Sequence, residues 1–284
     1  MAVNFKLLKQ QGFMRQKQKN RFSVRIRVVG GHLTATQLAG IAEIAEKFGN
    51  GTVHLTSRQS VEIPFVKLEE LDQFRQALAE KNLETANCGA GVRTVTACQG
   101  NAVCGSGCID TYGLAKELEE RYFTRKLPHK FKIGITGCQN NCLKAEENDL
   151  GIKGAVKAQW RESDCIHCGL CEKACRHHAL VLENNQVKIN PELCTLCGRC
   201  YHVCPVKCWD AEHGYLVTLG GLFGNTISKG RAVTGFIADK QELLKICDTA
   251  IDFFEEYANS GERFKFTLDR IGWEQIREKI AICE

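Results

Sequence analysis

The sequence predicts an α+β protein in which a cysteine-rich module interrupts the second of two α/β units. Three observations support this prediction. Strand and helix patterns alternate as β-α-β-β-α over the first unit, nine cysteines gather in one short segment, and strand character resumes after that segment. We therefore expect an N-terminal half-domain over 1–82, a second domain over 83–159 and 211–284, and an inserted module over 160–210.

The 17 cysteines in 284 residues need an explanation before any function is considered. A chain of this length, with 44% hydrophobic residues, builds an ordinary core and is not a disulfide-stapled miniprotein. Metal ligation is the expected role of the thiols. We find no signal peptide and no apolar run of about 18 residues, so we expect a reducing cytoplasmic location and no membrane partner.

The net charge of +5 admits nucleic acid, an anionic surface or an acidic substrate as partners. Anionic cofactors bound by the cysteines would account for the same excess of Lys and Arg. We expect no nucleic-acid partner, because the sequence lacks the interleaved aromatic and basic residues that single-strand binders use.

The first unit is predicted from alternation and from helix signals. Residues 21–29 alternate polar and apolar side chains, and 52–56 and 60–66 form two further short strands. Thr34 and Gln37 have capping-box spacing, and Gly49 ends that helix. The positions expected to pack are Leu38, Ile41, Ala45 and Phe48 in the first helix and Leu71, Phe74 and Leu78 in the second. This order resembles half of a ferredoxin-like sandwich.

The second domain is predicted to alternate cysteine-bearing loops with regular elements. We expect strands near 130–136, 151–157 and 215–219, and helices over 109–123, 241–257 and 273–282. A glycine-rich loop covers 220–224.

The inserted module carries the strongest local signal. Two runs have the spacing C-x2-C-x2-C-x3-C typical of bacterial two-cluster ferredoxins, in which the fourth cysteine of each run ligates the other cluster. We assign Cys165, Cys168, Cys171 and Cys204 to one 4Fe-4S cluster, and Cys194, Cys197, Cys200 and Cys175 to the second. Structural zinc is the alternative, because four thiolates also suit zinc. Arg176 stands where proline usually follows the fourth cysteine, and Cys208 has no assigned partner.

Four more cysteines form two pairs outside the module, Cys98-x5-Cys104 and Cys138-x3-Cys142. Small and polar neighbours allow the backbone to approach a cluster and donate N–H bonds to sulfur. On spacing alone they bind either an isolated 4Fe-4S cluster or zinc, and Cys108 can replace Cys104 as a ligand.

These two pairs, with three further segments, resemble the sirohaem-dependent sulfite and nitrite reductases. Thr56–Gln59 is similar to the family's TxRQ turn, Val92–Val95 to its RNV segment and Leu127–Lys132 to its LPxKFK strand. The likeness covers nearly the whole chain. It fits the compact single-repeat form, which is found in one subunit of anaerobic sulfite reductase and in small clostridial and archaeal sulfite reductase-like proteins.

The resemblance implies that Cys98, Cys104, Cys138 and Cys142 hold a third 4Fe-4S cluster and that Cys142 also ligates the sirohaem iron. It assigns Arg58, Arg93, Lys130 and Lys132 to the face where the anion binds. Strand alternation independently places Lys130 and Lys132 on one face, with Phe131 directed into the core. Two cations on one face suit an oxyanion. An ordinary solvated strand face is the alternative.

Other cofactor contacts follow from the resemblance with less support from the residues themselves. The family's glycine loop corresponds to Gly220, Gly221 and Asn225, followed by Arg231, although an ordinary turn has the same composition. Gln59, Gln99, Asn101 and Asn140 are candidates to hydrogen-bond the ring, and surface roles are the alternative.

The predicted function is the multi-electron reduction of sulfite to sulfide by sirohaem and three 4Fe-4S clusters. Nitrite reduction is one alternative, and many nitrite reductases of the family carry Asn where Lys132 stands. An iron-sulfur electron carrier without sirohaem is the other. No flavin or nicotinamide fingerprint appears, so we expect an external donor: a ferredoxin, or flavoprotein and iron-sulfur subunits. A single repeat also predicts a homodimer or higher oligomer.

Overall fold

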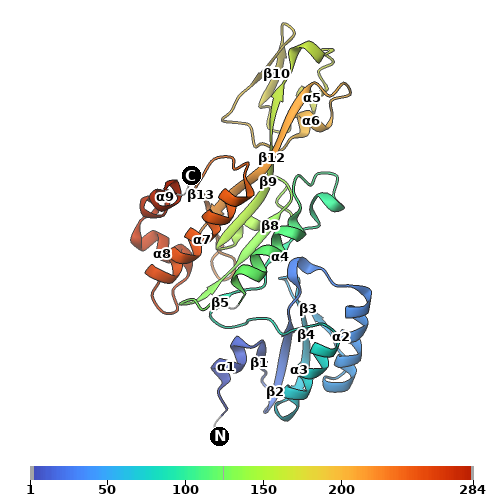
Figure 1. Ribbon diagram of the computed structural model, residues 1–284, viewed down its shortest axis with the longest axis vertical. Helices are drawn as coiled ribbons and strands as arrows, with labels where there is room; N and C mark the ends of the chain where they lie inside the picture. Colours follow the sequence, from blue (N-terminus) through green and yellow to red (C-terminus); the bar gives the residue numbers. More distant parts are fainter. Residues whose placement is uncertain (1–2, 124, 283–284) are drawn as a thin grey trace.

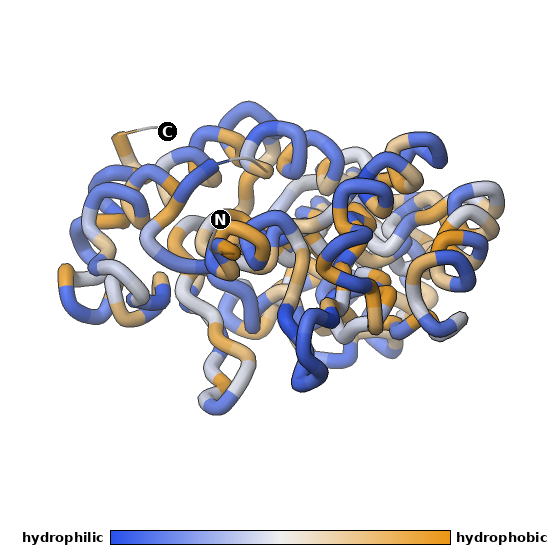
Figure 2. Tube along the Cα trace, turned by 90° about the horizontal axis from the view of Figure 1, so that it is seen from below, coloured by the Kyte–Doolittle hydropathy of each residue, from blue (hydrophilic) through white to orange (hydrophobic). Residues whose placement is uncertain are grey.

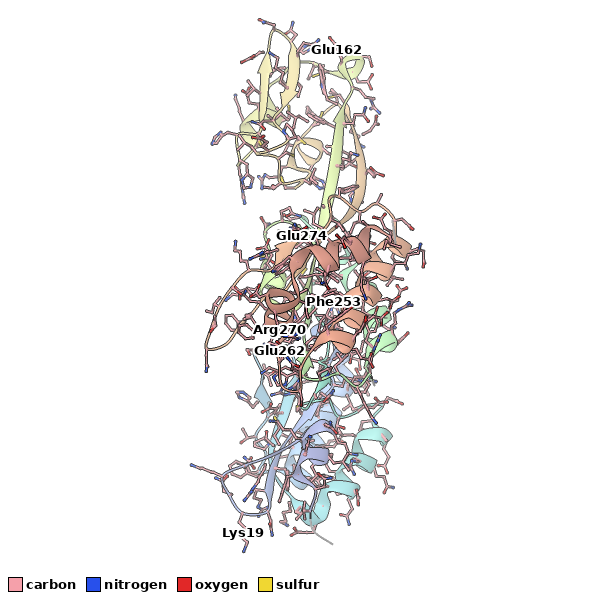
Figure 3. All side chains as sticks on the ribbon, turned by 90° about the vertical axis from the view of Figure 1, so that its left-hand side faces the viewer. Lys19, Glu162, Phe253, Glu262, Arg270 and Glu274 are labelled. Carbon is pink, nitrogen blue, oxygen red and sulfur yellow. The ribbon has the colours of Figure 1, made fainter. Side chains whose placement is uncertain are left out.

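The computed structural model describes residues 3–123 and 125–282 and arranges them as three units along its long axis (Figure 1). The N-terminal unit lies at one end, a mixed α/β domain lies in the middle, and the cysteine-rich insert projects at the other end. Lys19 and Glu162 mark these two ends in Figure 3.

The N-terminal unit is an antiparallel sheet of strand order β1-β2-β4-β3, packed against two helices. The capping box predicted at Thr34 and Gln37 is present. The strand predicted over 21–29 ends at Ile26, because Gly30 and Gly31 take positive φ angles of 58° and 74° in a short 3-10 turn. Its elements are α1 Phe5–Gln10, β1 Phe13–Arg15, β2 Arg21–Ile26, η1 Val29–Gly31, α2 Ala35–Phe48, β3 His54–Leu55, β4 Val61–Lys67, η2 Leu68–Glu70 and α3 Leu71–Glu80.

One predicted core position in this unit is wrong. Leu38 is 54% exposed, whereas Ile41, Ala45 and Phe48 are buried as expected. The buried stripe of α2 starts only at Gly40, so the first turn of the helix extends beyond the packed surface.

The central domain is built on a five-stranded mixed sheet of order β13-β12-β9-β8-β6. Strands β6, β8 and β9 run parallel, and β9, β12 and β13 pair antiparallel. The helix α8 was not predicted. The elements are β5 Gly91–Val92, β6 Thr96–Ala97, η3 Gly100–Ala102, α4 Thr111–Tyr122, β7 Lys130–Phe131, β8 Ile133–Thr136, η4 Ala145–Glu147, β9 Leu150–Trp160, β12 Trp209–Leu219, β13 Arg231–Ala232, α7 Lys240–Tyr257, α8 Phe264–Ile271 and α9 Trp273–Ala281.

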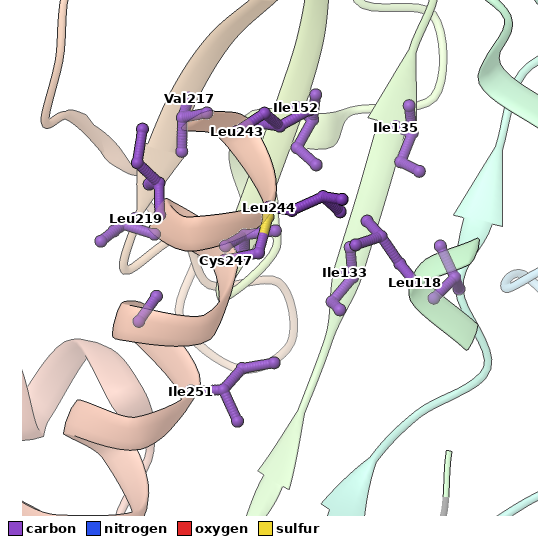
Figure 4. Close-up of a cluster of buried hydrophobic side chains, with 14 of the residues drawn as sticks. Leu118, Ile133, Ile135, Ile152, Val217, Leu219, Leu243, Leu244, Cys247 and Ile251 are labelled. Atoms are coloured by element: carbon purple, nitrogen blue, oxygen red, sulfur yellow. The ribbon is translucent and has the colours of Figure 1, made fainter. Parts of the chain in front are cut away.

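Helices cover both faces of this sheet. Figure 4 shows Leu243, Leu244 and Cys247 of α7 on one side of the strands and Leu118 of α4 beyond β8 on the other. All four residues belong to one buried hydrophobic cluster. Along the covering helices, hydrophobic and hydrophilic positions alternate around the turns (Figure 2), which is the pattern of amphipathic helices with one buried face.

The single strand predicted over 130–136 is in fact two. Lys130–Phe131 forms β7 and pairs with β5, whereas Ile133–Thr136 forms β8 and pairs with β6 and β9. The break falls at Lys132, whose backbone N–H donates to the Asp149 carboxylate at 2.8 Å instead of to a neighbouring strand.

The insert is carried on a two-stranded arm. Strands β9 and β12 pair in continuous register from Leu150 opposite Leu219 to Trp160 opposite Trp209. Beyond the two tryptophans, the insert holds a hairpin and two short helices. Its elements are η5 Glu162–Asp164, α5 Leu170–Ala174, β10 Leu180–Glu183, β11 Gln186–Ile189 and α6 Arg199–His202.

In the part of the chain that the structure describes, no helix combines the length and the apolar character needed to cross a bilayer.

Two leucines test the packing directly. Leu118 is 0% exposed in α4 and Leu38 is 54% exposed in α2. We expect Leu118→Ala to lower the free energy of unfolding by about 2–5 kcal/mol, because it leaves a cavity between helix and sheet. The matched change Leu38→Ala should alter it by less than about 0.5 kcal/mol. Urea titration of both variants measures the difference, and equal effects would contradict the assigned packing.

Candidate functional site

The four predicted anion-binding cations lie together at one edge of the central domain. Arg58 comes from the turn between β3 and β4, and Arg93 follows β5. Lys130 and Lys132 lie in and directly after β7. The parallel pairing of β5 and β7 brings two of these segments into contact, since the Arg93 N–H donates to the Phe131 carbonyl at 2.8 Å.

The two arginines are anchored by carbonyl and amide oxygens. Arg58 Nη1 donates to Asn148 Oδ1 at 2.9 Å, and its Nη2 donates to the Thr94 carbonyl at 3.1 Å. Arg93 Nη1 and Nη2 donate to the carbonyls of Asn87 and Cys88 at 3.0 and 2.6 Å. Arg93 Nε is buried with no hydrogen-bond partner among the described residues. An N–H donor is therefore left over in a positively charged site.

Burial and mutual repulsion destabilise the charged forms of these side chains. Burial first, and then repulsion by Arg58 and Arg263, lowers the pKa of Lys132 to about 8. Burial also lowers the pKa of Arg58 to about 10. The pKa values of Lys130 and Arg93 are lowered, again first by burial. A bound anion would relieve this repulsion, so the site suits a small oxyanion.

Two charged residues of this site were missed by the sequence analysis. Asp149 is fully buried just before β9, and Arg263 precedes the unpredicted helix α8. Arg263 Nη2 donates to both carboxylate oxygens of Asp149 at 2.9 Å. No local motif marks either residue, because the pair joins positions 114 apart in the chain.

The cysteine pairs outside the module lie at the other end of β8 from Lys132. Cys98 follows β6 and Cys138 follows β8, and these two strands are neighbours. The Gly137 N–H donates to Cys98 Sγ at 3.0 Å. A Cβ atom at Gly137 would lie 3.0 Å from the Gly100 Cα and 3.5 Å from Cys98 Sγ, so the glycine permits this close approach.

The other two thiols of this set, Cys104 and Cys142, are solvent-exposed. Burial raises the pKa of Cys138, on which the three other thiols of the set act electrostatically, and the Asn140 backbone N–H opposes that rise. The structure therefore brings the four cysteines together. N–H donors directed at thiolate sulfur are typical of iron-sulfur sites, so the donor set fits a cluster.

Cys108, the alternative ligand, is buried and hydrogen-bonds to the Ser106 carbonyl at 3.6 Å. Burial first, and then the neighbouring thiols of Cys138, Cys197 and Cys104, raises its pKa to about 11. A neutral thiol is therefore favoured at this position.

The eight cysteines of the two runs surround two separate pockets, four around each. One pocket, of about 230 Å³, is lined by Cys175, Cys194, Cys197 and Cys200; the other is lined by Cys165, Cys168, Cys171 and Cys204. Backbone N–H groups of His167 and Ala179 donate to Cys165 and Cys175 at 3.4 and 3.2 Å. The grouping agrees with the crossed assignment made from the spacing.

Cys208, which had no predicted partner, lies with its Sγ 3.4 Å from that of Cys204. Within the described ranges, no three His, Cys, Asp or Glu side chains converge closely enough to hold a single metal ion.

The remaining predicted contacts divide into packed and exposed residues. The Gln59 amide is engaged with the Ala97 backbone through two hydrogen bonds, of 2.9 and 3.0 Å. Gly220 has a φ of 76°, and a Cβ there would lie 2.9 Å from Trp273. Gly221 is buried against the Glu146 and Asn148 backbone, and the Arg231 guanidinium lies 4.6 Å from the Trp273 ring centroid. Exposed side chains with room for a ligand are Gln99, Asn101, Asn140 and Asn225.

The glycine-rich loop connects the two halves of the site. Lys132 Nζ donates to the Phe223 carbonyl at 3.3 Å, and Lys144 Nζ lies 4.9 Å from the centroid of the Phe223 ring. Lys144 is two residues after Cys142. The cations and the exposed thiol therefore flank the same loop.

The thiol sets, the group of cations and the α/β fold suit an iron-sulfur protein that binds a small anion. Comparison with known proteins agrees, and the chain belongs to the nitrite and sulfite reductase family. The model of the nitrite and sulphite reductase 4Fe-4S domain matches residues 88–282, and the model of the ferredoxin-like half domain matches 14–81.

Individual relatives cover most of the chain. One subunit of the anaerobic sulfite reductase of Salmonella typhimurium is 34% identical over 243 residues, which are 78% of this chain and 72% of the relative. The coenzyme F420-dependent sulfite reductase of Methanocaldococcus jannaschii is 29% identical over 98% of this chain, which matches 45% of that relative. The crystal structure of dissimilatory sulfite reductase I has a similar fold, with a TM-score of 0.76 and 19% identity over 92% of this chain and 69% of that one.

Proposed function

We propose that this chain is a sulfite reductase that reduces sulfite to sulfide at a sirohaem coupled to a 4Fe-4S cluster. One observation carries the proposal: the cations lie near the start of β8, Cys98 and Cys138 follow the far ends of β6 and β8, and Lys132 and Lys144 both contact Phe223 of the glycine-rich loop. The family, and the relatives that are sulfite reductases, support the same reaction class.

In this proposal the four thiolates of Cys98, Cys104, Cys138 and Cys142 hold the cluster, and Cys142 is shared with the sirohaem iron. The unsatisfied Arg93 N–H and the surrounding cations fit a ring that carries carboxylates. Bound there, the sirohaem supplies the iron at which sulfite accepts electrons.

The cations bind the anion and supply protons. The guanidiniums of Arg58 and Arg93 are held by protein acceptors and supply fixed positive charge for an oxyanion. Arg93 Nε remains as a free donor among the described residues, and Lys130 and Lys132 add further charge. Lys132, with a pKa lowered to about 8, holds a proton at neutral pH and releases it readily. It is therefore the residue we assign to protonate departing oxygen.

Electrons reach this centre through two further 4Fe-4S clusters in the inserted module. The cluster held by Cys175, Cys194, Cys197 and Cys200 is the one nearer the catalytic set. Supporting this order, the Val156 N–H of β9 donates to the Leu196 carbonyl at 2.7 Å, and Gly198 packs directly against Val156. A cavity of about 240 Å³ is lined by Cys138 of one set and Cys197 of the other.

The cluster held by Cys165, Cys168, Cys171 and Cys204 is then the entry point. Cys168 is exposed, and so are the apolar residues Ile166 and Leu170 beside it. An external ferredoxin, or flavoprotein and iron-sulfur subunits, would deliver electrons there. Because the chain carries a single repeat, we also propose a homodimer or higher oligomer.

Nitrite reduction is the rival activity, because the family contains both kinds of enzyme. The second lysine of the cation set favours the doubly charged sulfite over nitrite. We expect kcat/KM for sulfite to exceed that for nitrite on one anaerobic preparation supplied with a low-potential reductant. The reverse order would reassign the substrate.

Removal of one anion-binding guanidinium tests the site. We expect Arg58→Ala to lower kcat/KM for sulfite by roughly 100-fold, with higher KM and lower kcat, because a preorganised positive charge is lost. The absorbance of the macrocycle should be unchanged. Arg277→Ala, which removes an exposed partner of Glu274 on α9, serves as the control. Unchanged kinetics in Arg58→Ala would remove this residue from the site.

Two equivalent glycines test the electron route. Gly169 and Gly198 precede α5 and α6 with φ angles of 71° and 68°, so alanine strains both backbones alike. A Cβ atom at Gly198 would lie 2.7 Å from the Val156 side chain in β9. Within the described part of the chain, a Cβ atom at Gly169 would have no other atom within 4 Å. We expect Gly198→Ala to slow electron transfer from the module to the catalytic centre far more than Gly169→Ala. Stopped-flow spectroscopy measures both rates at matched iron content, and equal slowing would contradict the proposed order.

A further inference from the structure

A buried carboxylate stands among the cations of the anion site. Asp149 is 0% exposed and uses both oxygens. Arg263 Nη2 donates to Oδ1 and Oδ2 at 2.9 Å, and the Lys132 backbone N–H donates to Oδ2 at 2.8 Å. The carboxylate therefore connects Arg263 to the peptide that carries Lys132.

This peptide is held at the point where the strand is interrupted. Lys132 lies between β7 and β8, where its N–H leaves the sheet ladder for Asp149. Its carbonyl accepts from the Leu150 N–H at 3.1 Å, so the segment directly after Asp149 holds the other side of the same residue. The Asp149 carbonyl in turn accepts from the Gly220 N–H at 2.8 Å, at the start of the glycine-rich loop.

Arg263 adds a further cation to the site from a distant part of the chain. Its side chain is 14% exposed, and its Nε is buried without a hydrogen-bond partner among the described residues. Its charge acts on Lys130, Lys132, Arg93 and His129. The Asp149–Arg263 pair is thus a buried ion pair that lies within electrostatic range of the cation set.

We propose that Asp149 and Arg263 are positioning residues of the anion site: the Asp149 carboxylate fixes the Lys132 backbone among the surrounding cations, and Arg263 holds that carboxylate in place. This inference rests on the proposed function for the identity of the anion. The Asp149–Arg263 pair does not depend on which anion binds, because both residues and their contacts lie within this chain.

The electrostatics agree with this geometry. Burial lowers the pKa of Lys132 most, and the facing cations Arg58, Arg263 and Lys130 lower it further. Asp149 is the facing group that raises it. Burial raises the pKa of Asp149 itself, while Arg263 and the Lys132 N–H favour its ionised form. Loss of the carboxylate charge therefore makes the Lys132 ammonium harder to maintain at neutral pH.

The decisive variant is Asp149→Asn, which keeps an acceptor oxygen for the Lys132 N–H and removes the charge. The holoprotein is treated with an amine-acylating reagent across a pH series, and labelling of Lys132 is followed by peptide mass spectrometry. We expect the labelling midpoint of Lys132 to fall by up to about one pH unit, since a nearby opposite charge favours the charged form and Asp149 raises the pKa of Lys132. Exposed Lys188 provides the internal reference.

A matched control separates positioning from plain stabilisation. Glu146 pairs with Lys153 at side-chain exposures of 16% and 13%, and with Lys229 at 3.5 Å, without a hydrogen bond to Lys132. Glu146→Gln should cost similar thermal stability and leave the Lys132 midpoint and the sulfite KM unchanged. In Asp149→Asn, the KM for sulfite should rise with the shift of the midpoint.

An unshifted Lys132 midpoint in folded Asp149→Asn would overturn the proposal. Should that variant fail to fold, Arg263→Lys replaces it: the shorter lysine side chain retains the charge but does not reach the position from which Arg263 Nη2 donates to both carboxylate oxygens. Under the proposal it raises the sulfite KM with little loss of stability, and an unchanged KM would overturn it. Failure of the proposed function would give a different result. No variant would then turn over sulfite, but the labelling midpoint of Lys132 would still shift in Asp149→Asn.

Discussion

Like charges held close together are the constraint on which the rest of this structure depends. Arg58, Arg93, Lys130 and Lys132 converge from three separate segments, and burial lowers the pKa of each. Such an arrangement opposes folding unless backbone acceptors and a carboxylate hold it. Here the carbonyls of Asn87, Cys88 and Thr94 and the Asp149 carboxylate do so.

The strand β8 connects this charge to the sulfur ligands. It begins directly after Lys132 and ends two residues before Cys138, and it lies between β6 and β9 in the buried sheet, with α4 and α7 on either side. A rigid strand fixes the separation of the anion site from the thiols more precisely than a loop would. The long paired strands β9 and β12 extend the same sheet and carry the inserted module, so all proposed electron carriers are attached to one scaffold.

Local patterns predicted much of this arrangement. The capping box, the alternation around Phe131 and the cysteine spacings are short-range signals, and each corresponds to a feature of the structure. The failures have a common cause. Leu38, the strand break at Lys132 and the Asp149–Arg263 pair all depend on which distant segment packs against them, and a single sequence carries no such information.

The bond from Cys142 to a macrocyclic iron is the central claim, and optical and chemical analysis of one anaerobic preparation tests it most directly. The account predicts a reduced-tetrapyrrole absorption band in the red, with iron and sulfide for three 4Fe-4S clusters per chain, and loss of the coupled centre in Cys142→Ser while the module clusters remain. An absorption spectrum of the intact protein with an iron-sulfur shoulder but no tetrapyrrole band would contradict this claim. The chain would then be an iron-sulfur electron carrier.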